Sequence, residues 1–403
     1  MKRLFITAAK RTPVANFQGS LKDQNLGEIG ALVIKKVLEE SNIPGSDVDE
    51  VMMGNIYSAG LGGNISRQAS VKSGIPVEVP AYSINMLCGS GMKAVINAAL
   101  SIRGGMNDVV VAGGLESMSG APYLVSGKTR DGIKMGNIEM EDHMLKDGLI
   151  DAFHNYHMGV TAENVSDKHQ IPREDQDKFA LESQMRASKA QEAGYFDSEI
   201  VPVEIKTRKG VVSFDKDEYI KADTTLETLA KLRPAFKKDG GVTAGNASGI
   251  NDAVSATVVA SEDYVKEHNI EPLVEIIGLG QAGVEPSVMG LGPVPAIRKA
   301  LKNANLKLSD IEAIELNEAF AAQSIGVLKE LSEEHGVSYE DLLEKTNIYG
   351  GAIAIGHPVG ASGNRIIVTL INIMKRNNYK YGLASLCIGG GMGTAVILKN
   401  IEN

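Results

Sequence analysis

Two cysteines and one histidine, each beside closely spaced glycines, are the residues of this chain best suited to covalent chemistry. Cys88 lies in Asn85-Met86-Leu87-Cys88-Gly89-Ser90-Gly91, where an expected strand turns into an expected helix over residues 92–101. A helix N-terminus offers free N–H groups and partial positive charge, which favour the nucleophilic thiolate. The pattern predicts a reactive thiol. The alternative is that Cys88 is a small buried apolar residue, as many free cysteines are.

The other two reactive side chains lie near the carboxyl end of the chain. Cys387 begins the run Cys387-Ile388-Gly389-Gly390-Gly391, and His357 stands between Gly356 and Pro358. Because these neighbours fix the backbone, His357 is not expected inside a helix or a central strand. If the fold brings the imidazole to Cys88, it can take the thiol proton. A structural or solvated histidine is the alternative.

Metal and nucleotide sites fit the sequence less well. Structural zinc sites usually contain close C-x-x-C pairs, whereas the two cysteines here are about 300 residues apart. The segment Gly278–Gly283 matches G-x-G-x-x-G after an expected strand. A dinucleotide site also needs an acidic residue about 20 positions later at the end of a strand, and that region is an expected helix. We therefore expect no metal and no redox cofactor.

Composition restricts the partners and the class of protein. The 403 residues carry 41 Lys and Arg against 50 Asp and Glu, and this net charge of −9 argues against a nucleic acid partner. The 44 glycines, with Val, Ile and Ala runs at helix-length intervals, favour an α/β enzyme. No apolar stretch approaches the roughly 18 residues of a membrane span, and the opening segment does not match a signal peptide. We expect a cytoplasmic protein that does not enter a membrane.

A weak internal repeat predicts two similar halves. Residues 38–51 align with residues 301–314 at an offset of 263, and each copy reads as a helix end, a turn and a strand. Cys88-Gly89-Ser90-Gly91 aligns with Gly360-Ala361-Ser362-Gly363, and residues 109–114 align with residues 386–391. The shared order predicts two α/β halves with largely parallel, buried strands. Since sites form at the carboxyl ends of such strands, Cys88, Cys387 and the segment after residue 316 can share one crevice.

The segment from about 119 to 243 has a different texture. Glycine-, methionine- and aspartate-rich loops such as residues 134–140 replace the strand and helix rhythm, apart from a charged helix expected over residues 173–193. Long loops in compact proteins are usually functional or interfacial. We expect an inserted loop domain that covers a ligand and touches a partner subunit.

Taken together, the motifs of this chain resemble the thiolase family, most closely its biosynthetic acetyl-CoA acetyltransferase branch. They occur in family order over the whole chain. The matching segments are residues 85–91, 157–164 (HMGVTAEN), 233–236 (RPAF), 243–249 (TAGNASG), 317–320 (NEAF), 356–363 (GHPVGASG) and 387–393 (CIGGGMG).

The resemblance implies a role for each matched residue. Cys88 becomes acylated, His357 activates it, and Cys387 moves the proton on the α-carbon of the second acyl group. Asn317, through a water, joins His357 in holding a thioester oxygen. The N–H groups of Cys88 and Gly389 form a second oxyanion hole.

For the coenzyme A part of the substrate, the resemblance implies contacts from the loop domain and its flank. Ser248 meets the pantetheine arm, and six residues line its path: His157, Met158, Phe236, Met289, Ala319 and Phe320. Lys221 stands where relatives commonly carry an arginine near the phosphates, and lysine lacks the bidentate fork of arginine. A solvated loop lysine and plain core residues are the alternatives.

The resemblance also implies a fold, a reaction and an assembly. The fold is a layered α-β-α-β-α core of two duplicated halves, with residues 1–118 (completed by about 244–270) and 271–403 flanking the inserted domain 119–243. The reaction joins two acetyl-CoA into acetoacetyl-CoA and CoA, reversibly and without a cofactor, in a homotetramer. A broader-chain 3-ketoacyl-CoA thiolase and a non-catalytic acyl-CoA or lipid carrier are the alternatives. A ketoacyl synthase or hydroxymethylglutaryl-CoA synthase is less favoured, because the second cysteine motif is a thiolase trait.

Overall fold

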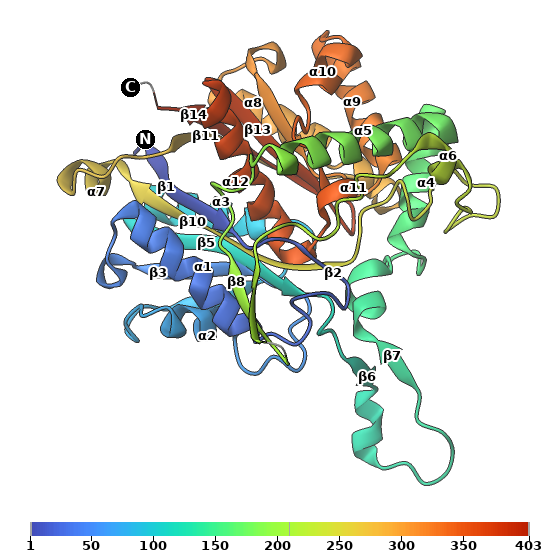
Figure 1. Cartoon of the computed structure of the whole chain (residues 1–403), viewed down its shortest axis with the longest axis horizontal. Helices are drawn as coiled ribbons and strands as arrows, with labels where there is room; N and C mark the ends of the chain where they lie inside the picture. Colours follow the sequence, from blue (N-terminus) through green and yellow to red (C-terminus); the bar gives the residue numbers. More distant parts are fainter. Residues whose placement is uncertain (1, 209, 402–403) are drawn as a thin grey trace.

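The computed structural model describes residues 2–208 and 210–401. Within these ranges one large sheet forms the centre of the molecule, in the strand order β12-β13-β14-β11-β1-β10-β5-β3-β4, with the short β2 paired to β10 (Figure 1). Its strands are β1 (Leu4–Arg11), β2 (Ala15–Asn16), β3 (Glu50–Gly54), β4 (Ala81–Ile84), β5 (Val109–Ser117), β10 (Asn251–Ser261), β11 (Val274–Gly283), β12 (Ala313–Leu316), β13 (Tyr381–Ile388) and β14 (Met392–Asn400).

The sheet consists of two related halves that meet at its centre. The order β1-β10-β5-β3 in the first half is repeated by β11-β14-β13-β12 in the second. The halves join where β1 and β11 pair antiparallel, with Phe5 opposite Glu275 and Ile6 opposite Val274. This arrangement confirms the duplicated halves. The three-part division into residues 1–118, 119–243 and 271–403 stays a prediction.

The expectation of largely parallel strands is wrong. Only the ladders β3–β4, β3–β5 and β12–β13 are parallel among the described strands of this sheet. Strand β14 follows β13 after only three residues, and such a short connection can join only antiparallel strands. Two of those three residues, Gly390 and Gly391, have φ values of 81° and 83°, a conformation that favours glycine.

The sheet register also corrects one part of the repeat. Val51 of β3 pairs with Val111, and its counterpart Ile314 of β12 pairs with Leu383. Val111 therefore corresponds to Leu383 at an offset of 272, so the alignment of residues 109–114 with residues 386–391 is displaced by five residues. That alignment matched the glycines of the two copies. In the first copy, however, the glycines lie in a buried strand, and in the second copy they form a tight turn.

Helices and sheet halves alternate in five layers, as predicted (Figure 1). Helices α1 (Leu26–Ser41) and α2 (Ile65–Lys72) pack on the outer face of the first half, and α8 (Pro293–Ala304) and α9 (Ala321–His335) on that of the second. Helices α3 (Ser90–Arg103) and α12 (Val359–Asn377) lie between the halves. Helix α12 is buried almost all round, which is typical of a helix in a central layer.

The segment between the halves combines an arm with packed helices. Strands β6 (Tyr123–Val125) and β7 (Met140–Asp142) form a hairpin that projects from the body (Figure 1). The charged helix predicted over residues 173–193 is α5 (Arg173–Glu192). The segment also contains α4 (Met158–His169), β8 (Val203–Thr207), β9 (Gly210–Phe214) and α6 (Leu226–Ala230). The other α-helices, α7 (Glu262–Glu267), α10 (Tyr339–Lys345) and α11 (Ala352–Ile355), belong to the two halves. Across the described ranges, every helix is too short or too polar to cross a membrane.

Candidate active site

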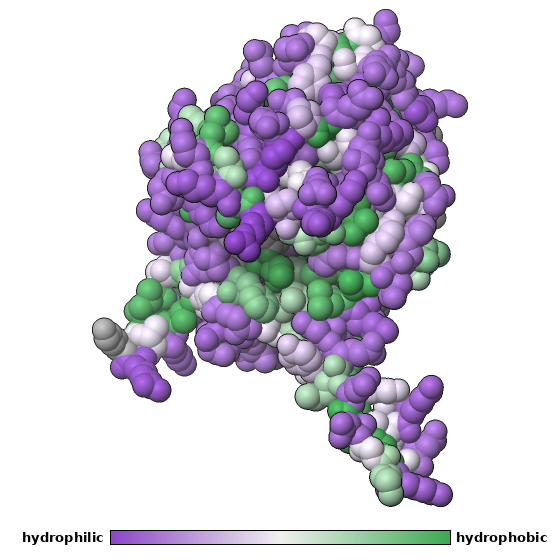
Figure 2. All heavy atoms as spheres, turned by 90° about the vertical axis from the view of Figure 1, so that its right-hand side faces the viewer, coloured by the Kyte–Doolittle hydropathy of each residue, from purple (hydrophilic) through white to green (hydrophobic). Residues whose placement is uncertain are grey.

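A cavity of about 660 Å³ brings together most of the residues that the sequence singled out. The face from which the arm projects shows apolar side chains around a hollow (Figure 2). The cavity contains reactive groups from both halves, Cys88, His357 and Gly389. The predicted coenzyme A contacts also line it: His157, Met158, Lys221, Phe236, Ser248, Met289, Ala319 and Phe320.

Cys88 is held at the cavity by a strained turn. Strand β4 ends at Ile84 and α3 begins at Ser90, with Leu87 between them at a φ of 47°. The Ser90 hydroxyl accepts a hydrogen bond from the Met86 N–H at 2.8 Å and donates one to the Leu87 carbonyl at 2.6 Å. These two hydrogen bonds and helix α3, which follows the turn, hold the half-buried thiol of Cys88 in place.

The environment of Cys88 corrects one expectation. The helix end was expected to favour the thiolate, yet burial raises the thiol pKa to about 11. The N–H groups of Gly389 and of Cys88 itself point at the sulfur and oppose this rise, whereas Glu116 adds to it. Desolvation outweighs the helix end, so the thiol is neutral at rest and needs a base.

Two segments from opposite halves meet at Cys88. A methyl group on Gly89 would lie 2.3 Å from the Ile388 Cδ1, and one on Gly389 would lie 2.9 Å from the Leu87 Cδ1. A side chain at either position would push these neighbouring side chains away. The glycines let the β13–β14 turn approach the nucleophile turn closely enough for the Gly389 N–H to reach the sulfur.

His357 is held as a neutral base. The Ser362 hydroxyl donates to the Pro358 carbonyl at 2.9 Å, so it accepts from the His357 Nδ1–H at 2.6 Å. This hydrogen bond leaves the lone pair on Nε2, which has no partner within residues 2–208 and 210–401. Burial, and then the positive charge of Arg365, lowers the pKa of the imidazole to about 3. Nε2 is therefore free to accept a proton.

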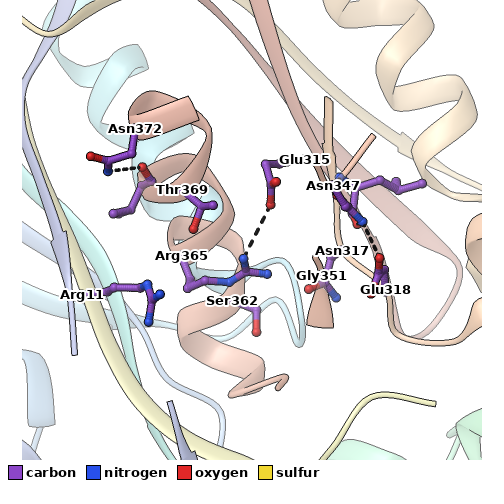
Figure 3. A network of polar contacts seen from close by, with 12 residues as sticks. Arg11, Glu315, Asn317, Glu318, Asn347, Gly351, Ser362, Arg365, Thr369 and Asn372 are labelled. Atoms are coloured by element: carbon purple, nitrogen blue, oxygen red, sulfur yellow. Dashed lines mark hydrogen bonds and ion pairs between the residues drawn. The ribbon is translucent and has the colours of Figure 1, made fainter. Parts of the chain in front are cut away.

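Asn317 lies on the Nδ1 side of the imidazole. Its Nδ2 is 3.5 Å from the His357 Nδ1, and its backbone N–H donates to the Ser385 carbonyl. It is fully buried and does not line the cavity. Figure 3 shows it between Glu318 and the pair formed by Arg365 and Glu315. The structure thus places Asn317 beside His357, as expected, but behind the cavity wall.

Cys387 also lies just behind the cavity wall. It is 1% exposed and packs with Met158, Met289, Ala319 and Phe320, four residues that do line the cavity. Burial raises its pKa, and the nearby Cys88 raises it further. The two thiols are therefore close enough to influence each other's charge, although the sequence separates them by almost 300 residues.

An aromatic wall continues the cavity away from Cys88. The rings of His157 and Phe236 stack at 4.5 Å, and Phe236 meets Phe320 edge-on at 6.2 Å. The exposed Lys221 places its Nζ 5.1 Å from the centre of the Tyr219 ring. This arrangement gives an apolar path with a cation near its outer end.

Sequence reasoning missed several lining residues. Asn16 of β2 and Phe17, the residue after it, both line the cavity. No sequence pattern marked either residue. Met118 directly follows Ser117, the last residue of β5. The rule that sites gather at the carboxyl ends of strands could have found Met118.

The competing site types gain no support. The glycines of Gly278–Gly283 lie inside β11, where a methyl group on Gly280 would meet the Ala296 carbonyl at 2.0 Å. They permit helix α8 to pack on the strand and do not form a phosphate-binding turn. Among the described residues, no group of three or more His, Cys, Asp or Glu side chains could hold a metal ion.

Comparison with known proteins identifies the family. The thiolase N-terminal domain matches residues 4–263 and the thiolase C-terminal domain matches residues 270–400. The chain is 51% identical over 395 residues to an acetyl-CoA acetyltransferase of Chromobacterium violaceum, covering 98% of each chain.

Similar solved structures point to the same family. The crystal structure of the Bacillus anthracis acetyl-CoA acetyltransferase matches with a TM-score of 0.94 at 43% identity, covering 100% of this chain and 99% of that one. The crystal structure of human mitochondrial 3-ketoacyl-CoA thiolase in complex with CoA matches with a TM-score of 0.93 at 44% identity, covering 100% and 98%. The resemblance carried by the motifs is confirmed, and this chain belongs to the thiolase family.

Proposed function

We propose that this enzyme joins two acetyl-CoA molecules into acetoacetyl-CoA and CoA, and that it also runs the reverse thiolysis. The observation that carries the proposal is the convergence of two thiols and a neutral imidazole from distant parts of the chain at one apolar cavity. A single acyl transfer needs one nucleophile and one base. A second buried thiol beside them suits a second proton transfer, which carbon–carbon bond formation requires.

In the first half-reaction, Cys88 accepts the acetyl group. The sulfur attacks the thioester carbonyl while its proton passes to the His357 Nε2. The carbonyl oxygen gains negative charge, and the N–H groups of Cys88 and Gly389, which already point at the sulfur, stabilise it. The bond from the carbonyl carbon to the CoA sulfur then breaks, and CoA leaves with a proton from Cys387.

In the second half-reaction, the Cys387 thiolate removes a proton from the methyl group of a second acetyl-CoA. Since Cys387 is buried and its pKa is raised, its thiolate is a strong base. Asn317, through a water, joins His357 in holding the enolate oxygen. The enolate carbon attacks the acetyl group on Cys88, the bond to sulfur breaks, and Cys88 regains its proton from His357. Two acetyl-CoA thus give acetoacetyl-CoA and CoA, and the thiols return to their starting state.

These steps need only coenzyme A thioesters, so we propose that the enzyme uses no metal or redox cofactor. The aromatic wall and Ser248 suit a pantetheine arm, and Lys221 suits a phosphate at the outer end. The similar solved structure that contains CoA is named a 3-ketoacyl-CoA thiolase. For this reason, a thiolase acting on longer acyl chains is the second candidate function. A short chain is favoured because Met158 fills the space around Gly389, and its Cε would lie 2.7 Å from a methyl group on that glycine.

Thiolysis rates across chain lengths test this proposal. We expect the highest kcat/KM for acetoacetyl-CoA, with lower values for 3-ketohexanoyl-CoA and 3-ketodecanoyl-CoA, because a longer acyl chain would have to displace Met158, which packs close to Gly389. Cys88→Ala protein serves as the blank. Higher kcat/KM on the longer substrates would establish the broader-chain alternative, and no turnover above the blank on any of them would establish the carrier.

We further propose a homotetramer, a dimer of dimers, in the cytoplasm. Support comes from the arm, where Met135 is 95% exposed and Met140 65%, with Ile138 between them at 58%. Exposed apolar side chains on a projecting hairpin are typical of an interface. Two cysteines that are both free suit a reducing compartment.

Charged substitutions on the arm test the tetramer. We expect Met135→Asp with Ile138→Asp to reduce the sedimenting species from a tetramer to a dimer, because each buried carboxylate would be desolvated at the interface. Lys134→Asp, a neighbouring exposed position, is the matched control and should leave the tetramer intact. Unchanged sedimentation of the double variant would contradict the role of the arm.

A further inference from the structure

Glu116 is a fully buried acidic residue at the carboxyl end of β5. It is the last but one residue of the strand, its exposed fraction is 0%, and it lies outside the set of residues that line the cavity. Burying a carboxylic acid is costly unless hydrogen bonds satisfy its oxygens. The groups that bind these oxygens therefore indicate what the residue does.

Four N–H groups donate to the Glu116 side chain, two to each oxygen. Its Oε1 accepts from the Asn55 Nδ2 at 3.0 Å and from the Tyr57 N–H at 3.2 Å. Its Oε2 accepts from the N–H groups of Ile56 and Gly360, both at 3.0 Å. Because every partner is a donor, all four hydrogen bonds are complete only when Glu116 is a carboxylate.

On one side, these bonds lead to the turn that carries Cys88. The Asn55 Nδ2 also donates to the Leu115 carbonyl at 3.0 Å, which fixes the orientation of the amide. The Asn55 backbone N–H donates to the Ile84 carbonyl at 3.0 Å. Ile84 is the last residue of β4, and the nucleophile turn follows it directly. Glu116 thus holds the loop on which the start of that turn depends.

On the other side, the carboxylate caps the helix that follows His357. Helix α12 begins at Val359, and its N-cap residue Pro358 makes no side-chain cap hydrogen bond. The N–H of Gly360, the second residue of the helix, donates instead to Glu116, 244 positions away in the sequence. An anion at a helix N-terminus is stabilising. This contact holds the first turn of α12 three residues after the catalytic imidazole.

Glycines let these segments come together around Glu116. A methyl group on Gly360 would lie 2.6 Å from the Glu116 Oε2 and 3.1 Å from the Asn55 Cα. A methyl group on Gly54, at the end of β3, would lie 2.5 Å from the Gly360 carbonyl oxygen and 2.6 Å from the Gly91 nitrogen. The first turns of α3 and α12 therefore meet at the end of β3, so a displaced carboxylate would disturb both.

We propose that Glu116 is a positioning residue that ties the nucleophile turn of one half to the His357 segment of the other, and so sets the separation of the Cys88 thiol from the imidazole. The inference rests on the proposed function in one respect, the transfer of the Cys88 proton to His357. A displacement of about 1 Å in a catalytic group can cost about 100-fold in rate. Glu116 prevents such a displacement without touching the substrate.

Two substitutions separate the size of Glu116 from its charge. Glu116→Gln keeps the size but presents an amide nitrogen to N–H donors, and Glu116→Asp keeps the charge but is one methylene short. Asp49→Asn is the matched control, because the Asp49 Oδ2 accepts the N–H groups of Asp108 and Val109 at 2.7 and 2.9 Å where β5 begins. All proteins are compared at pH 9, because burial raises the pKa of Glu116 to about 8.

The first measurement is the time course of Cys88 acetylation by acetyl-CoA, followed by rapid quenching and mass spectrometry. We expect the rate constant at saturating acetyl-CoA to fall about 10-fold in Glu116→Gln and about 100-fold in Glu116→Asp. The half-saturating concentration should not change, because Glu116 does not line the cavity. Asp49→Asn should match the wild type.

The same time course separates positioning from a merely structural role. If Glu116 only stabilised the fold, its loss would lower the amplitude of acetylation, since part of the protein would be unfolded, and the folded part would react at the wild-type rate constant. A wild-type rate constant in either Glu116 variant would therefore overturn the proposal.

Hydrogen exchange gives a second readout that does not depend on the reaction. We expect the backbone amides of residues 55–57, of residues 359–362, or of both to exchange about tenfold faster in each Glu116 variant, because at least one pair of N–H groups loses its acceptor. In Asp49→Asn the change should stay near residues 108–109. If the wild type is not acetylated, the proposed function fails, and exchange still decides the inference: wild-type exchange in both segments rejects it.

Discussion

Replacing Cys387 by alanine is expected to leave Cys88 able to take an acetyl group from acetyl-CoA while condensation falls by about 10³-fold, the range of a lost general base. The two thiols differ in position, since Cys88 lines the cavity and Cys387 is buried behind Met158 and Met289. Only Cys88 can reach the thioester carbonyl directly. Removing the second thiol should therefore separate the half-reactions.

The measurement combines intact mass with rates. Cys387→Ala protein mixed with acetyl-CoA should gain one acetyl group, more slowly than the wild type, and should then form acetoacetyl-CoA at the reduced rate. Cys88→Ala protein is the control and should gain none. If Cys387→Ala failed to become acetylated although correctly folded, the division of labour between the thiols would be wrong.

The second large effect is on stability. Gly114→Ala is expected to lower the free energy of unfolding by about 3 kcal/mol, the upper range for overpacking a close contact. A methyl group there would lie 2.0 Å from the Gly360 carbonyl oxygen and 2.7 Å from the Ala361 Cα, and backbone atoms cannot turn away as side chains do. The first turn of α12 would have to move, and His357 with it, so activity should fall too.

Urea unfolding of Gly114→Ala and of a matched control measures this effect. Gly63 has no atom within 4 Å of the added methyl position and no positive φ, so Gly63→Ala should change the free energy of unfolding by about 0.5 kcal/mol or less. Equal stability of the two variants would show that the contact between β5 and α12 is not as tight as described.

The sequence was sufficient for the family and for the reactive residues of the site. Motifs around Cys88, His357 and Cys387 each contain glycines that a close approach requires, as Gly89 and Gly389 show. A side chain at either position would have to displace its neighbours, so the glycine pattern in the sequence reflects this packing. The helices α3, α5 and α8 were also predictable, because their lengths and boundaries depend on local sequence.

Other features depend on contacts that no local pattern records. The antiparallel order of β10 between β1 and β5 joins strands more than 100 residues apart, and the register of β13 was misjudged by following glycines. The thiol pKa of Cys88 depends on burial by distant segments, which reversed the effect expected from the helix end alone. Ser362, which fixes the imidazole, was visible only as part of a motif.

The central claim is that Cys88 carries the acyl group and that His357 activates it. The most direct measurement is mass spectrometry of wild-type protein after brief mixing with acetyl-CoA and acid quenching, with peptide mapping of the adduct. We predict one acetyl group per chain on Cys88, lost when free CoA is added, and little or none in His357→Asn on the same timescale. An adduct on another residue, or none on the wild type, would contradict the mechanism.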